Sequence, residues 1–166
     1  MHLLALVEGA VAAEIERKFL VTDASWRDQV ERTQVIRQGY FGGTEKASLR
    51  VRLSDDHAWL NIKSATLGIS RQEYEYPIPA ADAREMLDNL CETPLIEKTR
   101  HYLHHHGHLW EIDEFFGDNA GLVVAELELE SVEERFQRPA WLGEEVSDDP
   151  RYYNVCLVKH PYREWA

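Results

Sequence analysis

The segment Glu14-Ile15-Glu16-Arg17-Lys18 decides how the rest of the chain is interpreted, because it puts a charge at every second position where an apolar-rich stretch begins. Alternate side chains of a β-strand point to the same face of a sheet. Glu14, Glu16 and Lys18 therefore share one face if this segment is a strand. Three charges on one face are ordinary in solvent and costly to bury. The direction of this face is therefore the first question that the sequence raises.

The same alternation recurs along the chain. Seven segments carry charged or polar residues at period two, with mostly apolar residues between them. The other six contain Arg50 and Arg52; Asn61 and Lys63; Glu73 and Glu75; Lys98 and Arg100; Glu111 and Asp113; and Glu126, Glu128 and Glu130. One such segment is typical of a half-exposed strand. Seven segments of mixed sign instead indicate the strands of a barrel whose charged faces converge.

This pattern predicts an α+β fold built on an eight-stranded antiparallel β-barrel, a tunnel with a charged lumen and a few flanking helices. Strands are expected over residues 14–21, 34–42, 48–54, 57–64, 71–78, 95–105, 108–116 and 122–132, and helices over 24–32, 80–91 and 150–158. Short connections such as Ser54-Asp55-Asp56 favour antiparallel neighbours. If the charged faces turn inward, the apolar residues between them face outward and need cover. Helices would supply part of that cover, and a homodimer would supply more.

Composition limits the class of protein. The 166 residues suffice for one domain, and we expect residues 1–13 to be an extension and residues 14–166 to form that domain. A net charge of −12 disfavours nucleic acid and anionic membranes as partners, since both need basic surfaces. Cys91 and Cys156 fit neither a disulfide framework nor a CxxC site. With no apolar run approaching the roughly 20 residues of a membrane span, the expected location is the cytoplasm.

The charged faces contain two chemically distinct sets of residues. The acidic set comprises Glu14, Glu16, Asp113, Glu126 and Glu128, and the basic set comprises Lys18, Arg50, Arg52, Lys63, Lys98 and Arg100. Carboxylates are hard oxygen donors that suit Mg²⁺ or Mn²⁺. Arginine grips phosphate oxygens with two N–H groups, and lysine acts as a point charge. Both sets in one lumen indicate a metal–polyphosphate complex, the combination that phosphoryl transfer requires.

These motifs also follow one another in a characteristic order. They are Glu14-x-Glu16-x-Lys18, Leu49-Arg50-Val51-Arg52, Asn61-Ile62-Lys63, Ser70-Arg71-Gln72-Glu73-Tyr74-Glu75, Glu97-Lys98-Thr99-Arg100, Glu111-Ile112-Asp113, Glu126-Leu127-Glu128 and Arg151-Tyr152-Tyr153-Asn154. The first motif alone is a weak pattern, whereas the ordered set is highly specific. Over residues 14–162 the chain resembles the CYTH superfamily, the triphosphate tunnel metalloenzymes. The Ser-Arg-x-Glu-x-Glu element is similar to that of its short bacterial members.

This resemblance implies a metal-dependent hydrolase of inorganic triphosphate. On matching motifs, Glu14, Glu16, Asp113, Glu126 and Glu128 would hold metal, and Lys18, Arg50, Arg52, Lys63, Lys98 and Arg100 would hold the phosphates. The implied catalytic residues are Glu14, Glu16, Lys18 and Arg52, and the implied role of Glu73 and Glu75 is to orient the bases. In such tunnels one metal is thought to bind the triphosphate and a second to activate water. The final helix, over residues 152–159, is expected to plug one end of the tunnel.

Several other residues have more ordinary interpretations. The histidines at positions 101, 104, 105, 106 and 108 look like a metal cluster, but Gly107 and the flanking alternation place them at an exposed hairpin turn. Tyr40 is interpreted as structural. Glu130 either lies at the tunnel mouth or has a purely structural role, and both alternatives stay open. For Lys159 the open alternatives are that its side chain is in solvent or that it reaches the substrate.

Three alternative functions remain. A class IV-like adenylate cyclase would need to hold adenine. The chain lacks the His-Gly-Arg-Ala-Thr-Gly element by which members of the cyclase branch are recognised. A thiamine triphosphatase would need an aromatic surface for the thiazolium ring, which no motif residue supplies. A non-catalytic polyphosphate-binding module would be signalled by loss of a metal ligand, yet all the expected carboxylates are present.

Overall fold

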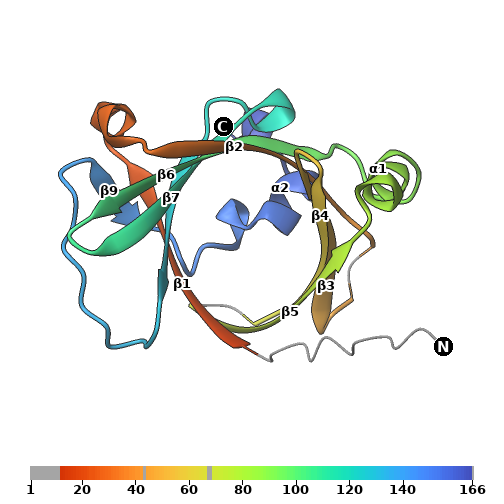
Figure 1. The fold of residues 1–166 in the computed structure, drawn as a ribbon, viewed down its shortest axis with the longest axis horizontal. Helices are drawn as coiled ribbons and strands as arrows, with labels where there is room; N and C mark the ends of the chain where they lie inside the picture. Colours follow the sequence, from red (N-terminus) through yellow and green to blue (C-terminus); the bar gives the residue numbers. More distant parts are fainter. Residues whose placement is uncertain (1–11, 43, 67–68, 166) are drawn as a thin grey trace.

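Eight antiparallel strands close into a barrel in the computed structural model, which describes residues 12–42, 44–66 and 69–165 (Figure 1). The strands are β1 (Ala12–Val21), β2 (Arg32–Tyr40), β3 (Ala47–Ser54), β4 (His57–Ser64), β5 (Ser70–Ile78), β6 (Ile96–His105), β7 (His108–Phe115) and β8 (Val123–Leu129). Their order around the barrel is β1-β5-β4-β3-β2-β6-β7-β8, and β8 pairs with β1 to complete the circle. The predicted barrel is therefore confirmed, with strand ends that differ from prediction by three residues or fewer.

Two elements differ from the prediction. A ninth strand, β9 (Leu142–Glu145), pairs with the C-terminal half of β1, and its four residues carry no alternation that could have revealed it. The helix expected over 24–32 is wrong in extent and type, since only Ser25–Gln29 forms a 3-10 helix. Trp26 is its buried residue, and at Val30 the backbone is already extended. One anchoring side chain gives no continuous apolar face for a longer helix.

The two α-helices lie near their predicted positions. Helix α1 (Ala80–Asn89) follows Pro79, whose fixed φ suits the residue that precedes a helix. A 3-10 turn (Pro150–Tyr152) precedes α2 (Asn154–Lys159). No helix of the described residues is long and apolar enough to cross a membrane. Residues 1–11 lie outside the described part of the chain, so the N-terminal extension and the domain boundary stay predictions.

The apolar outer face of the barrel is covered largely by the chain itself. On one side, Phe19, Trp110 and Leu127 pack with Trp26 and Trp141 from the connecting segments. On the other side, α1 covers β3 and β4, and the exposed fraction of Ala83 and Leu87 is 2% or less. Figure 1 shows α1 outside the ring of strands. The predicted homodimer is not required for this cover and stays a prediction.

A third apolar cluster lies inside one end of the barrel. Phe115 lies two residues after Asp113 and Val124 two residues before Glu126, so each shares the inward face of its strand with charged residues. There they pack with Leu157 and Val158 of α2, both almost fully buried. We call residues 153–159 the plug, and Figure 1 shows α2 within the ring of strands. The expected closure of one tunnel end by the final helix is confirmed.

Candidate active site in the barrel lumen

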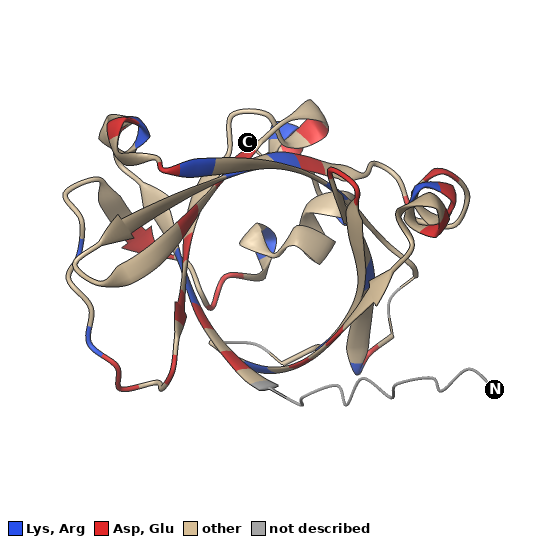
Figure 2. Ribbon diagram, viewed as in Figure 1, with Lys and Arg blue, Asp and Glu red and all other residues tan. Residues whose placement is uncertain are grey.

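A cavity of about 500 Å³ occupies the barrel lumen beside the plug. All eight barrel strands contribute to its wall, and Figure 2 shows acidic and basic positions interspersed around it. The lining residues are Glu14, Glu16, Lys18, Tyr40, Ser48, Arg50, Arg52, Asn61, Lys63, Arg71, Glu73, Glu75, Arg100, Glu111, Glu126 and Glu128, with Tyr153, Asn154 and Val155 from the plug. Lys18 and Glu126 are buried next to the plug, whereas Glu75 and Glu128 are exposed. The cavity therefore opens to solvent at the end away from α2.

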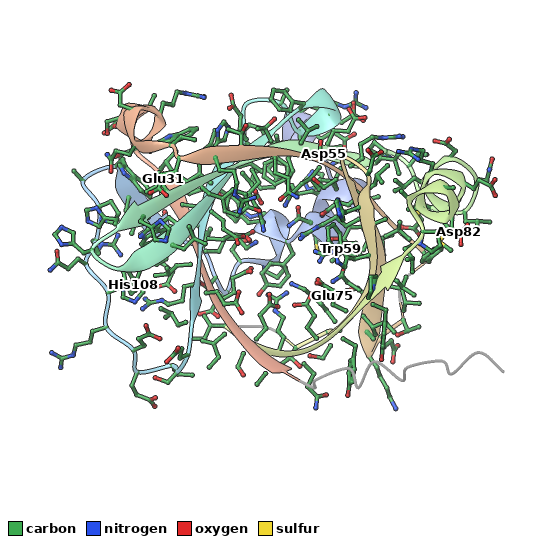
Figure 3. All side chains as sticks on the ribbon, in the orientation of Figure 1. Glu31, Asp55, Trp59, Glu75, Asp82 and His108 are labelled. Atoms are coloured by element: carbon green, nitrogen blue, oxygen red, sulfur yellow. The ribbon has the colours of Figure 1, made fainter. Side chains whose placement is uncertain are left out.

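The strand order divides the charges into two halves of the wall. The neighbouring strands β7, β8, β1 and β5 carry Glu111, Asp113, Glu126, Glu128, Glu14, Glu16, Glu73 and Glu75. The neighbouring strands β4, β3, β2 and β6 carry Lys63, Arg50, Arg52, Lys98 and Arg100. Lys18 on β1 and Arg71 on β5 are basic residues within the acidic half. An acidic wall thus faces a basic wall across one cavity, and Figure 3 shows Glu75 on the inner side of the barrel, whereas Asp82 on α1 lies outside.

Ion pairs and hydrogen bonds near the open end join the two halves of the wall. Lys63 Nζ lies 2.9 Å from Glu14 and 3.8 Å from Glu73. The Asn61 amide donates to Glu73 at 3.1 Å and to Glu75 at 2.6 Å, and Arg50 lies 3.6 Å from Glu73. Glu73 thus contacts two bases, whereas the hydrogen bond of Glu75 is to the neutral Asn61, and the orienting role of both residues stays a prediction.

A second network lies deeper, near the plug. Lys18 Nζ donates to Glu126 at 2.7 Å, and Arg100 donates to Glu126 at 3.0 Å and to both oxygens of Asp113. Lys98 Nζ donates to Asp113 at 2.6 Å. Burial opposes ionisation of Glu126, yet Lys18 and Arg100 hold its pKa well below the usual range. These groups satisfy one another in the free protein.

Lys98 and Asp113 are the two predicted site residues that do not line the cavity. The side chains of both are 0% exposed, and they form their ion pair at the plugged end, where Lys98 also contacts Asn154. Burial lowers the pKa of Lys98 to about 7, against the opposing effect of Asp113. The predicted metal-binding role of Asp113 and phosphate-binding role of Lys98 therefore stay predictions. The contacts of Asp113 in this structure are those of a group that positions Lys98 and Arg100.

Arg52 differs from the other basic residues of the lumen, because no ion pair forms to it within the described part of the chain. Its Nε donates to the neutral Gln38 amide at 3.2 Å. Burial lowers the pKa of Arg52 to about 10, and the neighbouring Arg50 and Arg100 add to this effect. A half-buried guanidinium near other cations favours an anion in the cavity.

Three carboxylates on the acidic half have raised pKa values, although Glu111 forms an ion pair with Arg100 and Glu16 lies 3.8 Å from Lys18 Nζ. Burial raises the pKa of Glu16, and the nearby charge of Glu126 adds to it. Burial also raises the pKa of Glu128 and of Glu111, with further contributions from neighbouring carboxylates. Acidic groups that repel one another in a poorly solvated wall are stabilised by a cation.

The donor set fits a hard divalent cation, since carboxylate oxygens without cysteine or histidine suit Mg²⁺ or Mn²⁺. Within residues 12–42, 44–66 and 69–165, no three His, Cys, Asp or Glu side chains converge closely enough to hold an ion by themselves. The reason is visible in the ion pairs, because Glu14 is drawn to Lys63 and Glu126 to Lys18. An anion that engages these bases would free the carboxylates for a cation.

Several lining residues were missed by sequence reasoning. Ser48 and Arg71 share strand faces with predicted residues, so the period-two pattern could have assigned them to the site. The pattern did place Asn61 and Glu111 on the charged faces, but without a role in the site. The contribution of the plug depends on long-range packing, which no local pattern reveals. Tyr40 packs in the inner cluster, as predicted for a structural residue, and it also lines the cavity.

The excluded residues lie away from the cavity. The hairpin turn at His106-Gly107 is confirmed, and each residue has positive φ. The expectation is wrong for His101, which lies inside β6 opposite Ile112 and packs against Trp26 with 12% of its side chain exposed. His101, His104 and His108 pair with Glu114, Glu31 and Glu134 rather than with one another. Glu130 and Lys159 are exposed and outside the cavity lining.

Comparisons with known proteins agree with this geometry. Residues 12–153 match the family model described as the CYTH domain. The chain is 45% identical over 152 residues to an inorganic triphosphatase of Acetivibrio thermocellus, covering 92% of this chain and 97% of that protein. It is 39% identical over 149 residues to an inorganic triphosphatase of Nitrosomonas europaea, covering 87% and 96%. The solved structure of the inorganic triphosphatase NE1496 is similar, with a TM-score of 0.63, 33% identity, and coverage of 90% of this chain and 97% of that chain.

Proposed function

The chain belongs to the CYTH domain family, and on that premise we propose that it hydrolyses inorganic triphosphate to pyrophosphate and phosphate in the barrel lumen. The observation that carries this proposal is the divided wall of the cavity. Arg52 is a half-buried cation that forms no ion pair with a carboxylate of the described residues, and Glu16, Glu111 and Glu128 are carboxylates whose pKa values are raised. A triphosphate with its divalent cation satisfies both walls at once.

The basic wall binds the phosphates. Arg52 and Arg50 present guanidinium groups from β3, Lys63 from β4, and Arg100 from β6. These cations hold the triphosphate in place and stabilise the negative charge that develops on the equatorial oxygens during transfer. Lys18 contributes from the acidic wall, next to Glu16 and Glu126.

The acidic wall holds the metal. Glu14, Glu16, Glu126 and Glu128 line the cavity and would serve as oxygen ligands for Mg²⁺ or Mn²⁺. When bound, the ion neutralises phosphate charge and makes a nearby water more acidic. Water attacks a terminal phosphorus, the P–O bond to the bridging oxygen breaks, and pyrophosphate leaves.

Substrates with an organic group are less well suited to this lumen. Tyr40 and Tyr153 are the aromatic residues of the described lining, and both lie at the plugged end. The Arg71 guanidinium already lies over the Tyr153 ring, 4.3 Å from its centroid. This arrangement offers little free aromatic surface to a base or a thiazolium ring.

A phosphate-release panel tests the proposed function. Tripolyphosphate, ATP, thiamine triphosphate and pyrophosphate are compared with Mg²⁺ and with Mn²⁺, and kcat/KM for tripolyphosphate is expected to exceed that for ATP by at least about tenfold. Equal rates, or faster ATP turnover, would refute the assignment. Formation of cyclic AMP from ATP would support the cyclase alternative instead.

A further inference from the structure

Asn154 belongs to the plug and to the cavity at the same time. It is the first residue of α2, and its side chain lines the cavity beside Tyr153 and Val155. Its Oδ1 accepts a hydrogen bond of 3.2 Å from Lys98 Nζ. Lys98 has no exposed side-chain surface, so Asn154 connects this buried amine to the lumen.

The contact with Lys98 fixes which way the Asn154 amide points. An ammonium group donates hydrogen bonds and cannot accept them. With Lys98 paired to Asp113 at 2.6 Å, the amide oxygen must be the atom that faces Lys98. The Nδ2 group, on the other branch of the same planar amide, must point elsewhere.

The Nδ2 group is a donor with room for a ligand. No described residue accepts a hydrogen bond from it. Four side-chain nitrogens of the described residues are buried without a hydrogen-bond partner, and Nδ2 of Asn154 is not one of them. Nδ2 is therefore accessible to solvent. Its Oδ1 accepts a hydrogen bond from Lys98 Nζ, which polarises the amide and makes the N–H groups stronger donors.

We propose that Asn154 is a substrate-binding residue supplied by the plug: its Nδ2 donates a hydrogen bond to a phosphoryl oxygen of the triphosphate, while Lys98 holds the amide in the donating orientation. This inference rests on the proposed function. Phosphoryl oxygens are strong acceptors, and Asn154 enters the lumen at the end where Lys18 and Arg100 lie buried. The binding site is then complete only when α2 is seated.

Two substitutions separate binding from anchoring. Asn154→Ala removes both hydrogen bonds. Asn154→Asp keeps an oxygen facing Lys98, so the anchor of the plug is retained, but it replaces the donor with a second acceptor. Lys159→Gln is the matched control, because it lies on the same helix, changes the net charge by the same amount as Asn154→Asp, and is exposed outside the cavity lining.

Tripolyphosphate is the probe, with its dissociation constant measured by calorimetry in EDTA and its KM and kcat measured with Mg²⁺. We expect Asn154→Ala to weaken binding by about tenfold, the effect of one lost hydrogen bond to a charged group. Asn154→Asp should weaken binding at least as much while the melting temperature stays at or above that of the wild type. Lys159→Gln should bind as the wild type does.

The results distinguish this inference from the proposed function. If the wild type binds and hydrolyses tripolyphosphate, and Asn154→Ala binds it equally well, the inference is wrong and the function stands. If Asn154→Asp retains wild-type affinity, Asn154 only anchors the plug, and the inference is again wrong. A wild type that neither binds nor hydrolyses tripolyphosphate overturns the proposed function and, with it, this role of Asn154.

Discussion

Arg52 is the residue whose local chemistry most strongly favours an anion in the lumen. It is half-buried, the positive charges of Arg50 and Arg100 act on it, and its hydrogen bond goes to the neutral Gln38. Lys18, Lys63 and Arg100 each have a carboxylate within 3.0 Å. The binding energy of a phosphate is therefore expected to depend more on Arg52 than on these paired bases.

For Arg52→Ala we expect KM for tripolyphosphate to rise by about ten- to a hundredfold, the loss of a charge-assisted hydrogen-bonding group. The affinity for Mn²⁺, measured by calorimetry, should change much less. Arg37→Ala is the control, because Arg37 pairs with Asp88 and Glu97 outside the lumen. An unchanged KM would remove Arg52 from the binding site.

Glu16 is the corresponding residue of the acidic wall. Its raised pKa shows that the free protein stabilises this carboxylate poorly, which a divalent cation would correct. Glu16→Gln preserves shape and removes the charge, so we expect kcat with Mg²⁺ to fall by about a hundredfold or more. Glu97→Gln, at an exposed position, serves as the control. Unchanged turnover in Glu16→Gln would refute a metal-binding role.

At the scale of elements, the strand alternation predicts most of the fold and much of the site. Because side chains alternate with period two, the charged residues of each strand must all lie on one of its two faces. Acidic and basic residues on these faces can neutralise one another, which makes it physically possible for the faces to point into the barrel. The same logic could not predict β9 or the plug. β9 is held by contacts with β1, and Asn154 reaches the lumen only because Leu157 and Val158 pack inside the barrel. These placements depend on residues more than a hundred positions away or on the complete barrel.

The pairing of β9 with β1 includes a salt bridge that predicts acid sensitivity. Arg17 Nε donates to Glu145 Oε1 at 2.9 Å, and a second contact joins the same two groups. The hydrogen bond from Arg17 lowers the pKa of Glu145 below its usual value of 4.5. A lowered folded-state pKa contributes stability above the unfolded-state value, and that contribution is lost as the pH falls through the folded-state pKa.

In urea unfolding at pH 7, the wild type should therefore have a higher unfolding free energy than Glu145→Gln. This difference in unfolding free energy should shrink below about pH 4. Because both side chains are partly exposed, the difference should not exceed about 1 kcal/mol. Glu144→Gln, a neighbouring exposed residue, controls for net charge. A difference that is constant with pH would show that the salt bridge does not titrate as proposed.

At the scale of the whole molecule, the lumen holds many charges that the free protein neutralises only among themselves. Ligands that bind the folded state alone raise its stability by mass action. We expect Mg²⁺ together with tripolyphosphate to raise the melting temperature more than the sum of the two added singly, since each satisfies one wall and frees the other. EDTA should abolish the excess. Purely additive shifts would argue that metal and phosphate bind independently.

The position of α2 inside the barrel affects how a substrate enters the lumen and how products leave it. Because Leu157 and Val158 fill one end of the barrel, the lumen is a pocket closed at that end and not an open channel. A long polyphosphate can insert one end but cannot thread past the helix, so the chemistry is restricted to chain ends. Among the described residues, the exposed end of the cavity is the one with Glu75 and Glu128, so we expect both products to leave there, the fragment nearer that end first.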